Sequence, residues 1–162
     1  MIVIEVIQIK WEGPFFIEDL KSLNNDKIDY GIYQIYGNHL VYGENVLLYI
    51  GQANEQTFFT RIRQHYYWLE DDFSFYIGRL SGQDTPSYEI WHNKISAAEQ
   101  LLIHIHAPSY NTANINSVNA DIVGHIHIFN IGKYKSLLPE VSGRRWLKEI
   151  EMLSDNVYRY NE

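Results

Sequence analysis

Two tripeptides that join a glycine to a tyrosine stand close together in the sequence. They are Gly31-Ile32-Tyr33 and Tyr49-Ile50-Gly51. Both lie in segments rich in β-branched and aromatic residues, which are typical of paired strands. Side chains paired across neighbouring strands lie about 5 Å apart, so Tyr33 and Tyr49 would point into one cleft if the register lets them face the same way. The alternative is that both tyrosines close the edge of a core.

A basic side chain and a titratable one follow the second tripeptide. Arg61 and His65 are four residues apart, so on a helix over 55–70 they would share one face. Arg63 would point elsewhere, since a step of two residues rotates by about 200°. An Arg and a His beside two tyrosines would form an anion site with a proton carrier. For either residue alone, a solvated helix face is the alternative.

A carboxylate and an amide complete the series of polar residues. Glu99 precedes an apolar run within 96–107, and Asn111 lies just past Pro108. A carboxylate that is buried without a cation costs several kcal/mol, so a bound metal would explain Glu99. A capping box, in which Glu99 reaches back to the amide of Ser96, explains it equally well.

Taken together and in this order, these residues resemble the GIY-YIG nuclease family. Its members carry a GIY strand, a YIG strand, a helix with Arg followed by His or Tyr, a helix with Glu, and a downstream Asn. The corresponding positions here are Gly31-Ile32-Tyr33, Tyr49-Ile50-Gly51, Arg61, His65, Glu99 and Asn111. The match covers about residues 29–114.

The resemblance implies a fold and a reaction. The expected fold is α/β (α+β), with a central three-stranded antiparallel sheet flanked by helices. The expected reaction is hydrolysis of DNA phosphodiester bonds with one divalent metal, Mg²⁺ or Mn²⁺. Such chemistry needs mainly charge neutralisation and alignment, and a hard cation held by one carboxylate, waters and substrate oxygens suits it.

The catalytic roles carried over from the family fall on five residues. Tyr33 would be the general base or orient the attacking water, and Tyr49 would help to hold that water or contact the phosphate. Arg61 would neutralise the phosphate, His65 would assist proton transfer or contact the phosphate, and Glu99 would bind the metal. A free tyrosine has a pKa near 10, so Tyr33 acts as a base only if a metal or nearby cations lower its pKa.

Four further residues are expected to contact the substrate or brace the site. Gly51 and Asn111 belong to the matched motifs, and Arg63 is a second candidate for the phosphate contact. Gln52 stands directly after the second tripeptide, where many relatives have lysine. Gln52 can hydrogen-bond a water or a phosphate but adds no positive charge.

The elements that must position these residues alternate in type. Strands are predicted over 2–10, 30–36, 46–53, 72–80 and 124–132. Helices are predicted over 14–23, 55–70 and 143–153. A further helical region is opened by Thr85-Pro86 and continued by 96–107. The order predicts one mixed domain over 1–162 with a nuclease-like core at 29–114. The segments 1–25 and 120–162 would be accessory, with their isoleucine-rich strands paired as a small separate sheet.

Composition narrows the class of protein. The chain has 162 residues, no cysteine, and 13 Lys and Arg against 20 Asp and Glu, for a net charge of −7. No stretch reaches the roughly 20 apolar residues of a membrane span, so we expect a cytoplasmic protein with no membrane partner. The negative charge argues against nucleic-acid binding unless the cations gather in one place. The alternatives are a catalytically weak or inactive nucleic-acid-binding module that keeps the fold, and a tyrosine-rich protein-interaction domain.

Overall fold

The structure is a computed structural model that describes residues 3–81, 88–144, 150–154 and 157–160. The start of the predicted second helical region, Thr85-Pro86, lies outside the described residues. So do residues 145–149 of the predicted last helix. Residues 150–153 of that predicted helix lie in a strand, β7, so a helix there is wrong.

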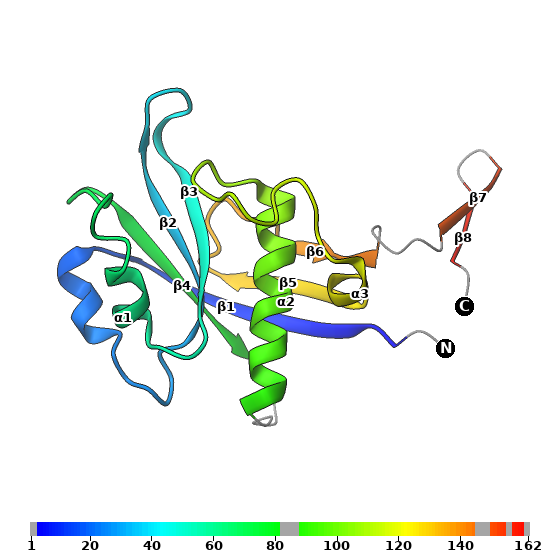
Figure 1. Cartoon of the computed structure of the whole chain (residues 1–162), viewed down its shortest axis with the longest axis horizontal. Coiled ribbons are helices and arrows are strands. Elements are labelled where there is room, and N and C mark those ends of the chain that lie inside the picture. Colours follow the sequence, from blue (N-terminus) through cyan, green and yellow to red (C-terminus); the bar gives the residue numbers. More distant parts are fainter. Residues whose placement is uncertain (1–2, 82–87, 145–149, 155–156, 161–162) are drawn as a thin grey trace.

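Six strands form one mixed, curled sheet in the order β3-β2-β4-β1-β5-β6 (Figure 1). Neighbouring strands are antiparallel except β1 and β5, which are parallel. Their bounds are β1 Glu5–Phe15, β2 Gly31–His39, β3 Gly43–Ala53, β4 Ser74–Ser81, β5 Ile126–Gly132 and β6 Glu140–Ser142. Two further strands, β7 (Ile150–Ser154) and β8 (Val157–Tyr160), pair with each other as a two-stranded sheet.

One long helix, α2 (Tyr88–His106), crosses a face of the six-stranded sheet (Figure 1). The other helices are single turns or little more: the 3₁₀ helix η1 (Ile17–Ser22), α1 (Phe58–Arg63) and α3 (Ala120–Val123). Within the described ranges, no helix is both long and apolar enough to cross a membrane.

The expected three-stranded sheet flanked by helices is wrong. The strands β3, β2 and β4 do lie side by side, but β1 adds to the free edge of β4 and the sheet continues through β5 and β6. β1 is hydrogen-bonded on both sides, with Gln8 opposite Ser81 of β4 and opposite Phe129 of β5. The two isoleucine-rich segments therefore pair as expected, yet within the main sheet and not as a separate accessory one.

The predicted helix over 14–23 is also wrong at its start. β1 continues through Pro14 to Phe15, and the helix η1 begins only at Ile17. The register of β1 against β4 shifts between Glu12 and Phe15. A proline cannot donate to a sheet ladder, and such an irregularity is where a strand tolerates one.

The helix predicted over 55–70 is shorter than its apolar spacing suggested. It begins after Thr57, whose hydroxyl accepts a hydrogen bond from the amide of Thr60, and α1 ends at Arg63. The chain then continues in turns. Phe58 and Ile62 are buried and Leu69 packs against the same core, but Tyr66 is exposed, so the apolar pattern does not follow one continuous helix face.

Two hydrophobic cores cover the two faces of the sheet. Successive side chains of a strand point to opposite faces. Ile32 of β2 accordingly packs in the core beneath α2, whereas Tyr33 packs with residues of η1 and α1 in the other core. The tripeptides therefore lie in strands that are packed on both sides.

A buried hydrogen-bond pair ties β1 to β5. The indole Nε1 of Trp11 donates to Oδ1 of Asn130 at 2.8 Å, and Nδ2 of Asn130 donates to the carbonyl of Leu138 at 2.8 Å. Trp11 and Asn130 are 1% and 2% exposed, so neither group can turn to water instead. An unsatisfied buried polar group costs about 1–3 kcal/mol.

We expect Asn130→Ala to lower the free energy of unfolding by about 2–4 kcal/mol, because it leaves the Trp11 indole and the Leu138 carbonyl without partners. Urea denaturation followed by tryptophan fluorescence measures this. Asn116→Ala, at an exposed position, is the control and should change the free energy by less than about 0.5 kcal/mol. Equal stabilities for the two variants would contradict the role given to Asn130.

Candidate active site

The two tyrosines of the tripeptides lie on the same face of neighbouring strands. Tyr33 faces Gly51 across the ladder and Ile35 faces Tyr49, so the two rings lie diagonally and stack with centroids 6.1 Å apart. A Cβ atom at Gly51 would lie 2.5 Å from the Tyr33 hydroxyl oxygen. Glycine is therefore needed at position 51 to make room for the Tyr33 ring.

His65 completes a cluster with the two tyrosines. The Tyr33 hydroxyl and Nε2 of His65 are hydrogen-bonded at 2.8 Å, and the His65 ring lies 4.8 Å from that of Tyr49. His65 belongs to the turns that follow α1, so it does not share a helix face with Arg61 as predicted. Both residues nevertheless act on the tyrosines.

Burial sets the protonation states of this cluster. It raises the pKa of Tyr33, a shift that the neighbouring Tyr49 increases and the Arg61 charge opposes. Burial, together with Arg61, lowers the pKa of His65 to about 4. At neutral pH the phenol is therefore protonated and the imidazole is neutral, and a single proton lies between Oη and Nε2.

Gln52 orients the predicted metal ligand, Glu99. The hydroxyl of Ser96 and Nδ2 of Asn54 both donate to Oε1 of Gln52, at 3.1 and 3.0 Å. With its oxygen fixed in this way, Gln52 turns Nε2 toward Oε2 of Glu99 and donates to it at 2.6 Å. Ser96 lies in the middle of α2, so it cannot be the N-cap that the capping-box alternative needed.

Glu99 is a partly buried carboxylate. In the parts of the chain with described side chains, no Lys, Arg or His lies within ion-pair distance of it. Burial raises the pKa of Glu99 to about 7, although the Gln52 hydrogen bond and the Arg61 charge oppose the shift. At neutral pH the group is thus divided between its charged and neutral forms.

The donor set around Glu99 suits only one kind of metal site. Among the described residues, no three His, Asp or Glu side chains are placed to hold an ion together. One carboxylate fits a magnesium ion that keeps most of its waters and takes its remaining ligands from a substrate. It does not fit a closed structural cage.

Asn111 braces the outer edge of β3. Its Oδ1 accepts from the amide of Ile50 and its Nδ2 donates to the carbonyl of Ile50, both at 2.9 Å. The amide of Tyr110 donates to the carbonyl of Leu48 at 2.7 Å. Both ends of the Asn111 side chain are thus hydrogen-bonded to the strand, as a residue that braces the site would be.

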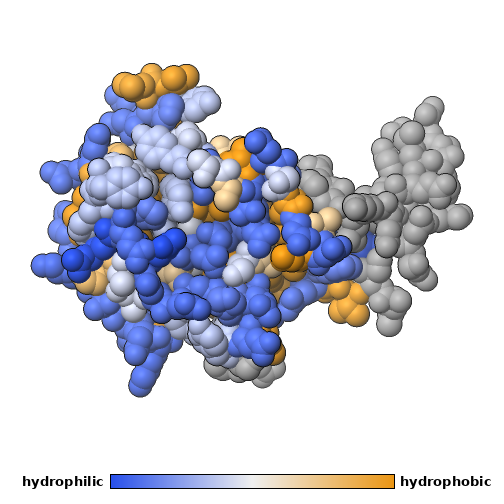
Figure 2. All heavy atoms as spheres, viewed as in Figure 1, coloured by the Kyte–Doolittle hydropathy of each residue, from blue (hydrophilic) through white to orange (hydrophobic). Residues whose placement is uncertain are grey.

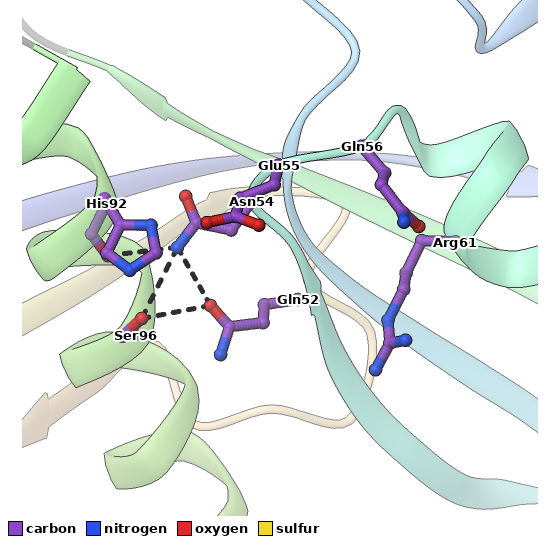
Figure 3. Close-up of a pocket in the computed structure, with 7 residues that line it drawn as sticks. All are labelled: Gln52, Asn54, Glu55, Gln56, Arg61, His92 and Ser96. Atoms are coloured by element: carbon purple, nitrogen blue, oxygen red, sulfur yellow. Dashed lines mark hydrogen bonds between the residues drawn. The ribbon is translucent and has the colours of Figure 1, made fainter.

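Arg61 lines a cleft of about 350 Å³ next to the cluster (Figure 3). Figure 3 shows Arg61 on the α1 side of the cleft and His92 and Ser96 on the α2 side, with Gln52 between them. Arg63 does not line this cleft; it is exposed and its guanidinium lies 5.0 Å from the centroid of the Phe59 ring. The full lining is Gln52, Asn54, Glu55, Gln56, Arg61, His92 and Ser96.

Sequence reasoning missed five of these lining residues: Asn54, Glu55, Gln56, His92 and Ser96. His92 and Ser96 precede Glu99 by seven and three residues, a spacing that places all three on one helix face. Asn54 follows Gln52 by two residues and so points the same way from an extended strand. Both spacings are visible in the sequence, and they could have identified the residues that orient Glu99.

Comparison with known proteins gives no relative for this chain. No family model, no curated protein and no solved structure matches it. The site is therefore interpreted from its own geometry.

The raised pKa of Glu99 predicts how stability depends on pH. An unfolded glutamate releases its proton near pH 4.5, whereas folded Glu99 retains it to about 7. Between these values the folded state binds more protons, so the free energy of unfolding should fall as the pH rises. Glu99→Gln keeps an acceptor for Gln52 but cannot ionise, so it should lack this decrease. Urea denaturation at several pH values measures the free energy of unfolding of both proteins. If it depends on pH in the same way for both, the raised pKa of Glu99 is ruled out.

Proposed function

We propose that this chain is a metal-dependent endonuclease that hydrolyses phosphodiester bonds of DNA, in the manner of the GIY-YIG nucleases that it resembles. One observation carries the proposal. Burial is the largest cause of each pKa shift in the cluster, but one cation, Arg61, acts on all of the titratable groups there: Tyr33, Tyr49, His65 and Glu99.

Arg61 is the residue that would receive the scissile phosphate. It lines the cleft, and its charge already acts on groups contributed by β2, β3, α2 and the turns after α1. A phosphoryl transition state is stabilised mainly by fixed charge, which a partly buried guanidinium supplies without reorganisation. The Arg61 guanidinium donates a hydrogen bond to the side-chain oxygen of Gln64, which helps to fix its position.

Glu99 would hold the divalent metal, with Gln52 fixing the direction of its carboxylate. A bound Mg²⁺ or Mn²⁺ would supply Lewis-acid stabilisation of the phosphate oxygens and activate a water. The Gln52 amide hydrogen bond favours the charged form of Glu99, which is the form that a metal needs. Gln52 thus supports this role without the positive charge that a lysine would add.

Tyr33 and His65 would remove the proton of the attacking water. Because the pKa of Tyr33 is raised, a free phenolate is unfavourable, and the hydroxyl acts best as a relay. When Nδ1 of His65 carries the ring proton, Tyr33 passes its own proton to Nε2 while it accepts one from the water. The water oxygen then bonds to phosphorus, and the P–O bond to the leaving oxygen breaks, with the electron pair staying on the leaving oxygen, which takes a proton from solvent water.

A second candidate function is a nucleic-acid-binding module with weak or no catalysis. Two observations favour it. The Tyr33 side chain is 0% exposed, so a water must enter the cluster before the relay can act. The Glu99 carboxylate is already hydrogen-bonded to Gln52, and a metal would compete with that bond.

We expect the protein to nick supercoiled plasmid DNA in the presence of Mg²⁺ or Mn²⁺. Glu99→Ala should reduce the rate by about 100-fold or more, since it removes the carboxylate assigned to the metal. Tyr33→Phe keeps the stacked ring and removes only the hydroxyl, so a loss of about 100-fold or more would identify the relay. Gel analysis of nicked and linear products measures the rates.

Glu140→Ala is the matched control, because this exposed carboxylate forms an ion pair with His127 of the neighbouring strand and lies outside the candidate site. It should cut like the wild type. Cleavage that Glu99→Ala leaves intact would refute the assignment of the metal ligand. Wild-type protein that binds DNA but cuts no plasmid, branched or single-stranded substrate would establish the second candidate instead.

A further inference from the structure

A continuous row of aromatic rings leads from the candidate site to the tip of the β2–β3 hairpin. Centroid distances between successive rings are 4.8 Å from Tyr49 to His65, 5.2 Å to Trp68, 5.2 Å to Tyr110, 5.8 Å to His39 and 4.7 Å to Tyr42. We call these six residues the aromatic track. They come from the two hairpin strands and their turn, the turns after α1, and the loop after α2.

The far end of the track is an exposed apolar tip. Leu40 is fully exposed, and Val41 and Tyr42 are 79% and 68% exposed. The tip stands clear of the body as the orange group at the top of Figure 2. Neighbouring exposed apolar side chains of this kind mark a contact site more often than chance.

The tip is held in a defined conformation. Nδ1 of His39 accepts hydrogen bonds from the amides of Val41 and Tyr42, at 3.1 and 3.2 Å. Tyr42 stacks on the His39 ring at an interplanar angle of 28°. The ring surfaces are therefore positioned before any partner arrives, which reduces the entropy cost of binding.

Two rings of the track are exposed, Tyr42 and Tyr110, whereas His65 is buried and Tyr49, Trp68 and His39 are half-buried. Tyr110 is 41% exposed and sits between Trp68 and His39. From Tyr49 to Tyr42 the strand spans roughly 20 Å, the length of several nucleotides. Rings at this spacing offer successive stacking positions to unpaired bases.

Charge indicates which part of a nucleic acid would meet the track. The net charge is −7, and the exposed acidic run 70–72 lies beside the hairpin, where Asp72 accepts a hydrogen bond from Asn38 at 2.9 Å. A duplex presents phosphates outward and keeps its bases stacked inside, so its approach here is unfavourable. A single strand can turn its bases toward the rings.

We propose that the aromatic track binds single-stranded DNA on one side of the bond to be cut, with bases stacked on Tyr110 and Tyr42. This rests on the proposed function, because the track begins at the cluster assigned to catalysis. The substrate class is then DNA with an unpaired segment, such as a single strand or the single-stranded arm of a branched molecule. Affinity comes mainly from base stacking.

The test measures binding apart from cleavage. A fluorescein-labelled oligothymidine is titrated with the full chain in EDTA, and its anisotropy is compared with that of a duplex of the same length. Wild-type protein should bind the single strand at least about tenfold more tightly than the duplex. Stacking of one base contributes about 1–3 kcal/mol, so Tyr42→Ser should weaken single-strand binding about tenfold.

Tyr88→Ser is the matched control, since Tyr88 is 64% exposed and begins α2, about 28 Å along the helix from its other end, where Tyr110 follows. It should bind like the wild type. Tyr42 is mostly exposed, so its replacement should leave folding intact, which circular dichroism checks. If the two serine variants bind the single strand equally well, or if the wild type binds single strand and duplex equally well, the proposal that the aromatic track binds single-stranded DNA is refuted.

The experiments distinguish a failure of the nuclease proposal from a failure of the proposal that the aromatic track binds single-stranded DNA. Tyr42-dependent binding of the single strand by a protein that never cuts DNA would refute the nuclease and keep the track. Cleavage of single-stranded DNA that Tyr42→Ser does not slow would keep the nuclease and refute the track. A change of oligomeric state in Tyr42→Ser, with unchanged DNA binding, would assign the tip to a second copy of the chain and also refute the track.

Discussion

The missing side chain at Gly51 is the constraint on which the candidate site depends. Tyr33 lies across this position, with its hydroxyl oxygen only 2.5 Å from where a Cβ would stand. From there it hydrogen-bonds to His65 and stacks on Tyr49. Any larger residue would displace the ring, and the shared proton and the coupling to Arg61 would be lost with it.

The position of β3 at the edge of the sheet lets both of its faces contribute. Gln52 points to the α2 side, where it meets Glu99, whereas Tyr49 and Gly51 point to the other side, where His65 lies. An interior strand could not bring such groups together, because neighbouring strands would separate them. Asn111 completes the arrangement by satisfying the outer backbone groups of Ile50, which would otherwise invite pairing with another chain.

The sequence allowed the strands that carry the tyrosines to be predicted, because alternation and β-branched content are local signals. The order of the strands in the sheet could not be predicted, since the place of β1 between β4 and β5 depends on contacts between residues far apart in the chain. The length of α1 was overestimated because the apolar pattern continues into turns. The hydrogen bond of Gln52 to Glu99 was not foreseen, since it needs Asn54 and Ser96 to fix the amide.

The order of the strands in the sheet also means that its two halves can form at different times during synthesis. β2 and β3 pair through a short turn, and β4 pairs with β2 at a smaller separation in the chain than β1 with β5, so these three strands can assemble early. β1 is made first, yet Glu5 must wait for Ile126 before its parallel partner exists. During synthesis the strands that carry the tyrosines therefore precede the completed sheet, and until then the first strand has an open edge.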